Sequence, residues 1–176
     1  MFADKSQTKN QGANVQFSAS KRGLFKAKKI VATNNLLPWI ADTQNFLNSC
    51  SQCGDCIAAC PEKIIVRGDG GYPNIDFNLG ECTFCGKCAE SCKEPIFLPS
   101  SASPWHKKAR INDGCLAVAQ VHCRSCAESC EAQALTFELA FNATPQIDSD
   151  LCTGCGACVA PCPTQAIVIG NYDEER

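Results

Sequence analysis

The chain has 176 residues, and its 16 basic and 18 acidic side chains leave a net charge of −2 at neutral pH. This length suits one or two small domains, and no apolar run reaches the roughly 18 residues that a transmembrane helix needs. Aromatic residues make up only 7% of the chain, so a conventional hydrophobic core would be thin. The 16 cysteines are the dominant chemical feature, and they fall into four groups along the chain.

Residues 1–35 are predicted to form a basic and largely disordered leader. Residues 1–30 contain seven Lys or Arg residues against Asp4 alone, whereas the remainder of the chain is acidic. The leader is either a solvated tail or a docking arm for a partner protein, and both interpretations stay open. We expect no nucleic-acid partner, because the basic segment is short and the body is acidic.

One stretch of the leader resembles an export signal. The stretch Ser20–Lys26 resembles a twin-arginine signal, with Lys21 at the position of the first arginine. The apolar stretch that should follow such a signal is missing. We therefore expect no export, no membrane insertion and a cytoplasmic protein, whose thiols stay reduced rather than forming disulfides.

Apolar residues between the leader and the first cysteine group are expected to anchor the chain. Leu36–Ile40 and Phe46 should pack against the module that follows. Trp39 has a second interpretation as a contact for a partner protein, because aromatic side chains often dominate interface energies.

Three cysteine groups have the C-x2-C-x2-C-x3-C spacing of bacterial ferredoxins. Cysteines three residues apart can reach three corners of one [4Fe–4S] cube, whereas the fourth comes too late and ligates the other cluster of a pair. Zinc ribbons are a weaker alternative, because they use two separated cysteine pairs. An interpretation of the cysteines as buried, inert thiols that act as small apolar side chains is a weaker alternative still. The three regular groups are Cys50, Cys53, Cys56 and Cys60; Cys82, Cys85, Cys88 and Cys92; and Cys152, Cys155, Cys158 and Cys162.

The remaining group is irregular and consists of Cys115, Cys123, Cys126 and Cys130. Gln120 occupies the position at which the first cysteine would fall, and Cys115 precedes it by five residues. A loop from Asp113 and Gly114 could still bring Cys115 to the cluster. The alternative is a three-iron or labile cluster at this site.

The crossing rule distributes all sixteen cysteines over four [4Fe–4S] clusters. In the first half of the chain, the predicted ligand sets are Cys50, Cys53, Cys56 and Cys92, and Cys82, Cys85, Cys88 and Cys60. In the second half, they are Cys115, Cys123, Cys126 and Cys162, and Cys152, Cys155, Cys158 and Cys130.

Each half of the chain contains a predicted β-hairpin between its two cysteine groups. In the first half, strands at 61–66 and 72–76 flank a glycine-rich turn. In the second half, the strands are expected at 135–139 and 145–148. The separations Cys60 to Cys82 and Cys130 to Cys152 are both 22 positions, which indicates an internal duplication.

The expected fold class is therefore α+β, with two tandem bacterial-ferredoxin-like modules. Each module should hold two [4Fe–4S] clusters, a small antiparallel hairpin and short helices. We place the modules at residues 36–98 and 115–176, with a Pro- and Ser-rich, semi-extended linker at 99–114.

The sequence also predicts separate roles for three large side chains in or near the linker. Trp105 is expected to cover a cluster or the interface between the modules. His106 should be a surface residue. His122, beside Cys123, is a conceivable ligand, but we expect it to have a packing role.

Several motifs together resemble those of the NapF family, the ferredoxin-type proteins of periplasmic nitrate reductase systems. The resemblance spans residues 20–170, and its departures, Lys21 for arginine and Lys93 for proline, affect no predicted ligand. The regular cysteine runs are unspecific, whereas the irregular third run and the basic leader are more specific. The matching motifs include Lys21-Arg22-Gly23-Leu24-Phe25, Gly68-Asp69-Gly70-Gly71, Val121-His122-Cys123-Arg124-Ser125-Cys126 and Cys152-Thr153-Gly154-Cys155.

The resemblance implies a cytoplasmic accessory protein. Such a protein binds the precursor of the catalytic nitrate reductase subunit, NapA, and assists its maturation through cluster or redox chemistry before export. The alternative function is a plain electron-transfer polyferredoxin in a respiratory chain, because four clusters in line would conduct electrons. We see no nucleophile, acid–base pair or substrate pocket in the sequence, so we expect a monomeric protein that is not an enzyme.

Overall fold

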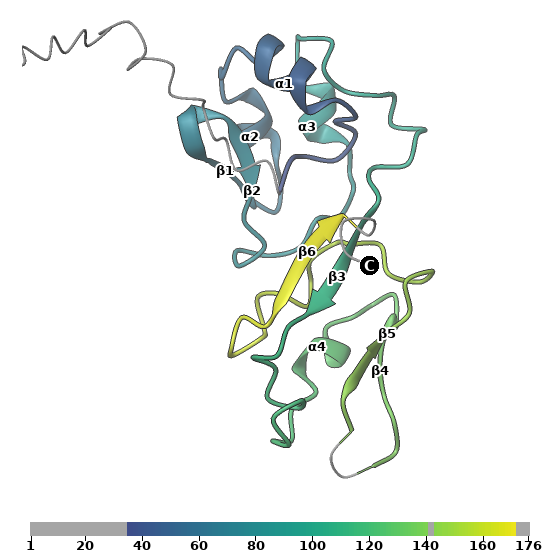
Figure 1. Cartoon of the computed structure of the whole chain (residues 1–176). Helices are drawn as coiled ribbons and strands as arrows, with labels where there is room; N and C mark the ends of the chain where they lie inside the picture. Colours follow the sequence, from purple (N-terminus) through teal and green to yellow (C-terminus); the bar gives the residue numbers. More distant parts are fainter. Residues whose placement is uncertain (1–34, 141–142, 172–176) are drawn as a thin grey trace, which may run out of the picture. The chain divides into compact units, whose positions relative to one another are not determined.

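The computed structural model describes residues 35–140 and 143–171 (Figure 1). The predictions for the leader, namely its disorder and its docking role, lie outside the described residues. Within the described ranges, no helix is long and apolar enough to cross a membrane.

The first half of the described chain contains three short helices and one hairpin (Figure 1). The hairpin strands pair antiparallel, with Ile65 opposite Ile75, and a 3-10 turn at Asp69–Gly71 connects them. Helix α2 contacts both α3 and β1, which brings the two cysteine groups of this half together. The elements are α1 (Thr43–Ser49), α2 (Asp55–Ala59), β1 (Ile65–Arg67), β2 (Pro73–Ile75) and α3 (Lys87–Glu90).

Helix α1 seals one end of this half. The Asp42 side chain caps it by accepting a 2.8 Å hydrogen bond from the N–H of Gln44. Phe46 is 1% exposed and packs against Tyr72, with 5.7 Å between the ring centroids. Leu36 belongs to the same cluster. The prediction that Leu36 and Phe46 anchor the start of the body is confirmed.

The second half repeats this plan around α4 (Ser125–Glu128), β4 (Leu135–Phe137) and β5 (Pro145–Ile147). Helix α4 contacts β4, and β4 pairs antiparallel with β5. Both predicted hairpins are therefore confirmed. A further two-stranded sheet joins β3 (Lys107–Ile111) to β6 (Ile167–Asn171), with Ala109 opposite Ile169.

Strand β3 corrects the expected linker at residues 99–114. Its five residues pair with the last strand of the chain, so this segment belongs to the second half and is not a free connection. The local sequence does not show this, because the pairing partner lies about sixty residues away.

Trp39 also holds the start of the expected linker in place. Its backbone N–H donates to the Pro104 carbonyl at 2.7 Å, and its indole N–H donates to the Ala102 carbonyl at 2.9 Å. The side chain is only 4% exposed. The interpretation of Trp39 as a partner contact is wrong, because its ring and its polar N–H are both used inside the fold.

The two halves share one apolar core. The buried cluster combines Leu37, Ile64 and Phe77 of the first half with Leu135 and Ile167 of the second. Buried apolar area is the main favourable term in folding, so this shared cluster couples the stability of the two halves.

Trp105 lies at the boundary between the halves. Its ring packs edge-on against Phe77 and Phe84, with centroid separations of 6.2 and 5.3 Å. Its indole N–H donates to the Thr153 carbonyl at 3.0 Å. The prediction that Trp105 covers the interface between the modules is confirmed.

Gly156 allows the closest approach between the halves. Its φ of +86° is a conformation that favours glycine, and a Cβ at this position would lie 2.0 Å from the Phe77 ring. A side chain at position 156 would therefore have to displace a ring that is 4% exposed.

We expect Gly156→Ala to destabilise the protein by about 2–4 kcal/mol, because backbone strain and overpacking add together. Gly170→Ala is the matched control, since nothing lies within 4 Å of a Cβ there. Anaerobic thermal unfolding, followed by circular dichroism and visible absorbance, measures the effect. Equal midpoints for the two variants would contradict the close packing of Phe77 on Gly156.

Candidate iron–sulfur centres

Four groups of cysteines each line a separate hollow in the described structure. The hollows contain between about 330 and 380 Å³ of space that protein atoms do not fill, part of it open to solvent. The groups are Cys50, Cys53, Cys56 and Cys92; Cys60, Cys82, Cys85 and Cys88; Cys115, Cys123, Cys126 and Cys162; and Cys130, Cys152, Cys155 and Cys158.

These groups have the same membership as the four predicted ligand sets. Each late cysteine lines the hollow of the other run, as the contact between α2 and α3 illustrates. Cys60 directly follows α2 and reaches the hollow of Cys88, whereas Cys92 follows α3 closely and reaches the hollow of Cys56. The ligation itself stays a prediction, but the cysteines that it requires are brought together.

The cysteine loops bend around the hollows through residues with positive φ. The second residue after the first cysteine is left-handed in all three regular runs: Gln52 at 58°, Phe84 at 52° and Gly154 at 74°. Two of these are not glycine, and each therefore accepts about 1 kcal/mol or more of backbone strain. Such strain persists only where the surrounding structure fixes the turn, which indicates that the loops are shaped for their contents.

Cys115 reaches its hollow through a compact turn. The N–H of Ala119 donates to the Cys115 carbonyl at 3.0 Å, and the N–H of Val121 donates to Leu116 at 2.8 Å. Gln120, with a φ of 65°, reverses the chain after this turn. The five extra residues are thus absorbed locally, and Cys115 lies beside the same hollow as Cys123.

Burial disfavours the thiolate form of several of these cysteines. Burial, with smaller contributions from nearby cysteines, raises the pKa of Cys88 and Cys158 to about 12. Burial likewise raises the pKa of Cys56, Cys82 and Cys126 to about 11. None of the cysteines is in a disulfide. Four thiols around one hollow, most of them at least partly buried, fit a metal cluster, which binds thiolates and displaces their protons.

Backbone N–H groups are directed at several of the sulfurs. The N–H of Ala109 lies 3.5 Å from Cys152 Sγ, and that of Ala166 lies 3.3 Å from Cys162 Sγ. Burial acts to raise the pKa of Cys162, but hydrogen bonds from Ala166 and Thr164 lower it overall. Donors of this kind stabilise a ligating thiolate and tune the potential of its cluster.

The histidines do not join these groups. His106 is exposed, as predicted, and His122 is exposed too, so the expected packing role for His122 is wrong. In the described ranges, no three His, Cys, Asp or Glu side chains converge tightly enough to bind a single metal ion. The cysteines are instead spread around a larger space, as a multi-iron cluster requires.

One contact that the sequence does not predict joins two cysteine groups from different halves. The N–H of Cys82 donates to the Cys155 carbonyl at 2.8 Å. The loops of these two groups therefore touch, and the adjoining Trp105 contacts both through Phe84 and Thr153. The sequence also does not predict that Lys107 lies beside this contact, because a single lysine in an expected linker forms no recognisable motif.

Comparison with known proteins agrees with this geometry. Residues 49–96 and residues 121–166 each match a family described as a 4Fe-4S dicluster domain. The chain is 42% identical over 156 residues to the "Ferredoxin-type protein NapF" of Escherichia coli, covering 87% of this chain and 95% of that protein. The Haemophilus influenzae protein of the same name is 43% identical over 141 residues, covering 79% of this chain and 80% of that protein. A component of the ion-translocating oxidoreductase complex of Methanosarcina acetivorans is 36% identical over 123 residues, or 67% of this chain and 46% of that protein.

The fold and the cysteine groups thus define an iron–sulfur protein with two 4Fe-4S dicluster ferredoxin domains. Within that class, the chain belongs to the NapF family of ferredoxin-type proteins, which are iron–sulfur proteins of nitrate reductase systems.

Anaerobic analysis should find about 16 iron atoms and about 16 acid-labile sulfides per chain, since each cubane supplies four of each. Removing the iron with a chelator should unfold the body, because the hollows would leave buried thiols without partners. Circular dichroism before and after chelation tests this. Bound zinc without labile sulfide, or a chelated chain that stays folded, would contradict the expectation.

Cys60→Ser should damage the cluster beside Cys82, Cys85 and Cys88, and leave that of the preceding run intact. The reason is that Cys60 lines the former hollow and not the latter. Resolved Mössbauer or EPR signals of the intact chain show which cluster changes. Cys130→Ser is the matched variant in the second half and should affect the site of Cys158. Loss of the cluster of the cysteine's own run would reject the crossed assignment.

Proposed function

We propose that this chain carries four [4Fe–4S] clusters, held by the four cysteine groups that line the hollows. The single observation that carries this proposal is the agreement between those groups and the crossed spacing of the two dicluster domains. Such clusters supply one-electron redox chemistry when bound. The protein contributes sixteen thiolates, turns that orient them and N–H donors to their sulfurs.

The function that we infer is that of a cytoplasmic, monomeric accessory protein. It binds the precursor of NapA, the catalytic subunit of periplasmic nitrate reductase, and assists its maturation before export, through its clusters or their redox state. The named NapF relatives support this role. We assign it no catalytic residues, and hence no enzymatic activity.

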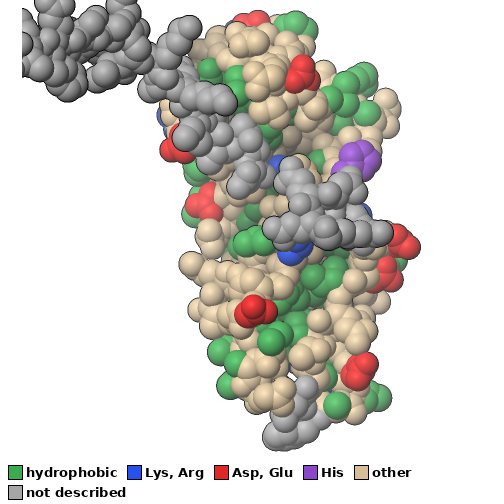
Figure 2. All heavy atoms as spheres, viewed as in Figure 1, with side chains coloured by type: hydrophobic (Ala, Val, Ile, Leu, Met, Phe, Trp, Pro, Cys, Tyr) green, Lys and Arg blue, Asp and Glu red, His purple; other side chains and the backbone are tan. Residues whose placement is uncertain are grey.

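The charge distribution supports a docking step. The described residues carry fourteen acidic and eight basic side chains, and carboxylates are spread over the face drawn in Figure 2. The leader has the opposite sign, with seven basic residues before position 31. Opposite charges on one chain can steer a partner to a defined orientation, and such steering raises the association rate.

An electron-transfer polyferredoxin is the second candidate function. The contact between the Cys82 and Cys155 loops favours it, because it joins cysteine sites of both dicluster domains. The similarity to a component of an ion-translocating oxidoreductase complex points the same way, although this chain covers only 46% of that protein. The two functions differ in their partner, and binding experiments can separate them.

Replacing the five basic residues at positions 21–29 by Gln should weaken precursor binding about tenfold at low salt and much less at high salt. The visible spectrum should not change, because these residues precede every cysteine. The matched control is Lys5→Gln with Lys9→Gln, which removes charge from the leader outside this segment. Binding is measured anaerobically by calorimetry with the purified NapA precursor.

Unchanged binding in the five-residue variant would show that the leader is only a solvated tail. An intact chain that binds no precursor, yet exchanges electrons rapidly with a low-potential flavoprotein, would favour the second candidate function.

A further inference from the structure

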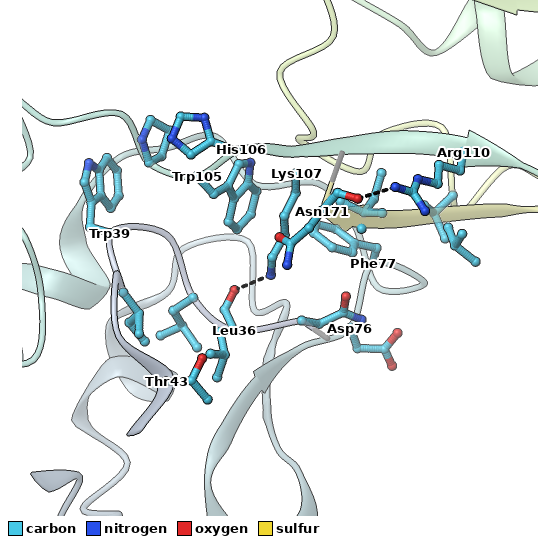
Figure 3. Close-up of a pocket in the computed structure, with 18 of the residues that line it drawn as sticks. Leu36, Trp39, Thr43, Asp76, Phe77, Trp105, His106, Lys107, Arg110 and Asn171 are labelled. Carbon is cyan, nitrogen blue, oxygen red and sulfur yellow. Dashed lines mark hydrogen bonds between the residues drawn. The ribbon is translucent and has the colours of Figure 1, made fainter. Parts of the chain in front are cut away.

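Lys107 is a buried lysine at the boundary between the two halves. It begins strand β3, and its side chain is only 7% exposed although it borders the hollow drawn in Figure 3. Burial of an ammonium group is costly unless another group compensates for its charge. The contacts of Lys107 therefore need an explanation that packing alone does not provide.

The protein supplies only part of that compensation. Lys107 Nζ donates to the Leu36 carbonyl at 2.9 Å, as Figure 3 shows, and lies 4.9 Å from the centre of the Trp105 ring. No Asp or Glu of residues 35–140 and 143–171 forms an ion pair with it. Burial lowers its pKa to about 8, and its electrostatic interaction with Cys82 opposes this shift.

Two cysteine loops lie close to Lys107. The Trp105 ring beneath its ammonium contacts Phe84, which lies between Cys82 and Cys85. The backbone of Lys107 itself meets the other loop, since a Cβ on Gly154 would lie 2.3 Å from the Lys107 carbonyl oxygen. The two loops join directly through the Cys82–Cys155 hydrogen bond. A buried positive charge is thus held where two cysteine sites meet, and the neighbouring Lys108 donates from its Nζ to the Cys152 carbonyl of the second site.

We propose that Lys107 is the counter-charge of the cluster site formed by Cys60, Cys82, Cys85 and Cys88, and that it raises the reduction potential of that site. Lys107 acts as a tuning residue and ligates nothing. This inference rests on the proposed cluster ligation.

The physical reason is the sign of the charge change on reduction. A cubane with four thiolate ligands is negatively charged, and an added electron makes it more so. A fixed ammonium in a site of low effective dielectric constant favours the more negative state, whereas the same charge in water is strongly screened. No bond or proton transfer to Lys107 is needed.

Lys107→Met removes the charge while keeping most of the length and the apolar stem of the side chain. It also removes the cost of burying an ammonium group, and circular dichroism checks that the variant is folded. Lys107→Arg keeps the charge and should restore most of the effect. Lys63→Met is the matched control, because Lys63 is exposed and lies three residues after Cys60, a predicted ligand of the same cluster.

The experiment is an EPR-monitored redox titration of the full chain, with titanium(III) citrate as reductant. Each cluster gains one electron as titanium(III) becomes titanium(IV). In the Lys107→Met variant, we expect reduction of one cluster to become about tenfold less favourable, while the other three keep their potentials. This corresponds to about 59 mV for a one-electron couple. Lys63→Met should shift no potential measurably.

Iron and labile sulfide analysis of the same samples separates this inference from the proposed function. Full cluster content with unchanged potentials in Lys107→Met would overturn the role of Lys107 and leave the cluster assignment standing. Missing clusters in the unmodified chain would overturn the assignment itself.

A second control replaces the acidic residues 173–175, which lie outside the described residues, by neutral ones. This variant should keep the wild-type potentials. A shift there would show that those carboxylates, and not a cluster, balance Lys107.

Discussion

The burial of cysteine thiols is the constraint on which this structure depends. The helices are short, from four residues in α3 and α4 to seven in α1, and helices of this length are marginal in isolation. Within residues 35–140 and 143–171, the strands are three to five residues long and form only two-stranded sheets. These elements surround hollows, and some of the thiols in the hollow walls have raised pKa values. A group that binds these thiolates stabilises the fold and the site at the same time.

Cysteine spacing made much of this arrangement predictable. The spacing of each cysteine run predicts its local structure, because three closely spaced cysteines on one loop bind the same cluster. The hairpins were equally accessible, since β-branched residues at Ile64–Val66 lead into a glycine-rich turn. Even the irregular group could be anticipated, because a turn beginning at Cys115 brings its side chain beside Cys123. These features share one property: the residues that decide them are near one another in sequence or follow a repeated pattern.

The features that escaped prediction depend on distant partners. β3 forms a strand because β6 is beside it, and its own sequence looks like a basic linker. Trp39 is buried because the chain returns over it at Ala102 and Pro104. The contact of Cys82 with Cys155 requires both halves to be folded. No local pattern carries this information, since the same residues without their partners would be exposed.

The pairing of β3 with β6 also sets an order for synthesis and assembly. The first half has its last cysteine at Cys92, so both of its sites are complete before β3 has been made. The second half closes only when Ile167–Asn171 reaches β3, and one of its sites needs Cys162. Contacts of long sequence separation form late and slowly. The newly made chain therefore passes through a stage in which one half can already take up metal while the other still presents open thiols.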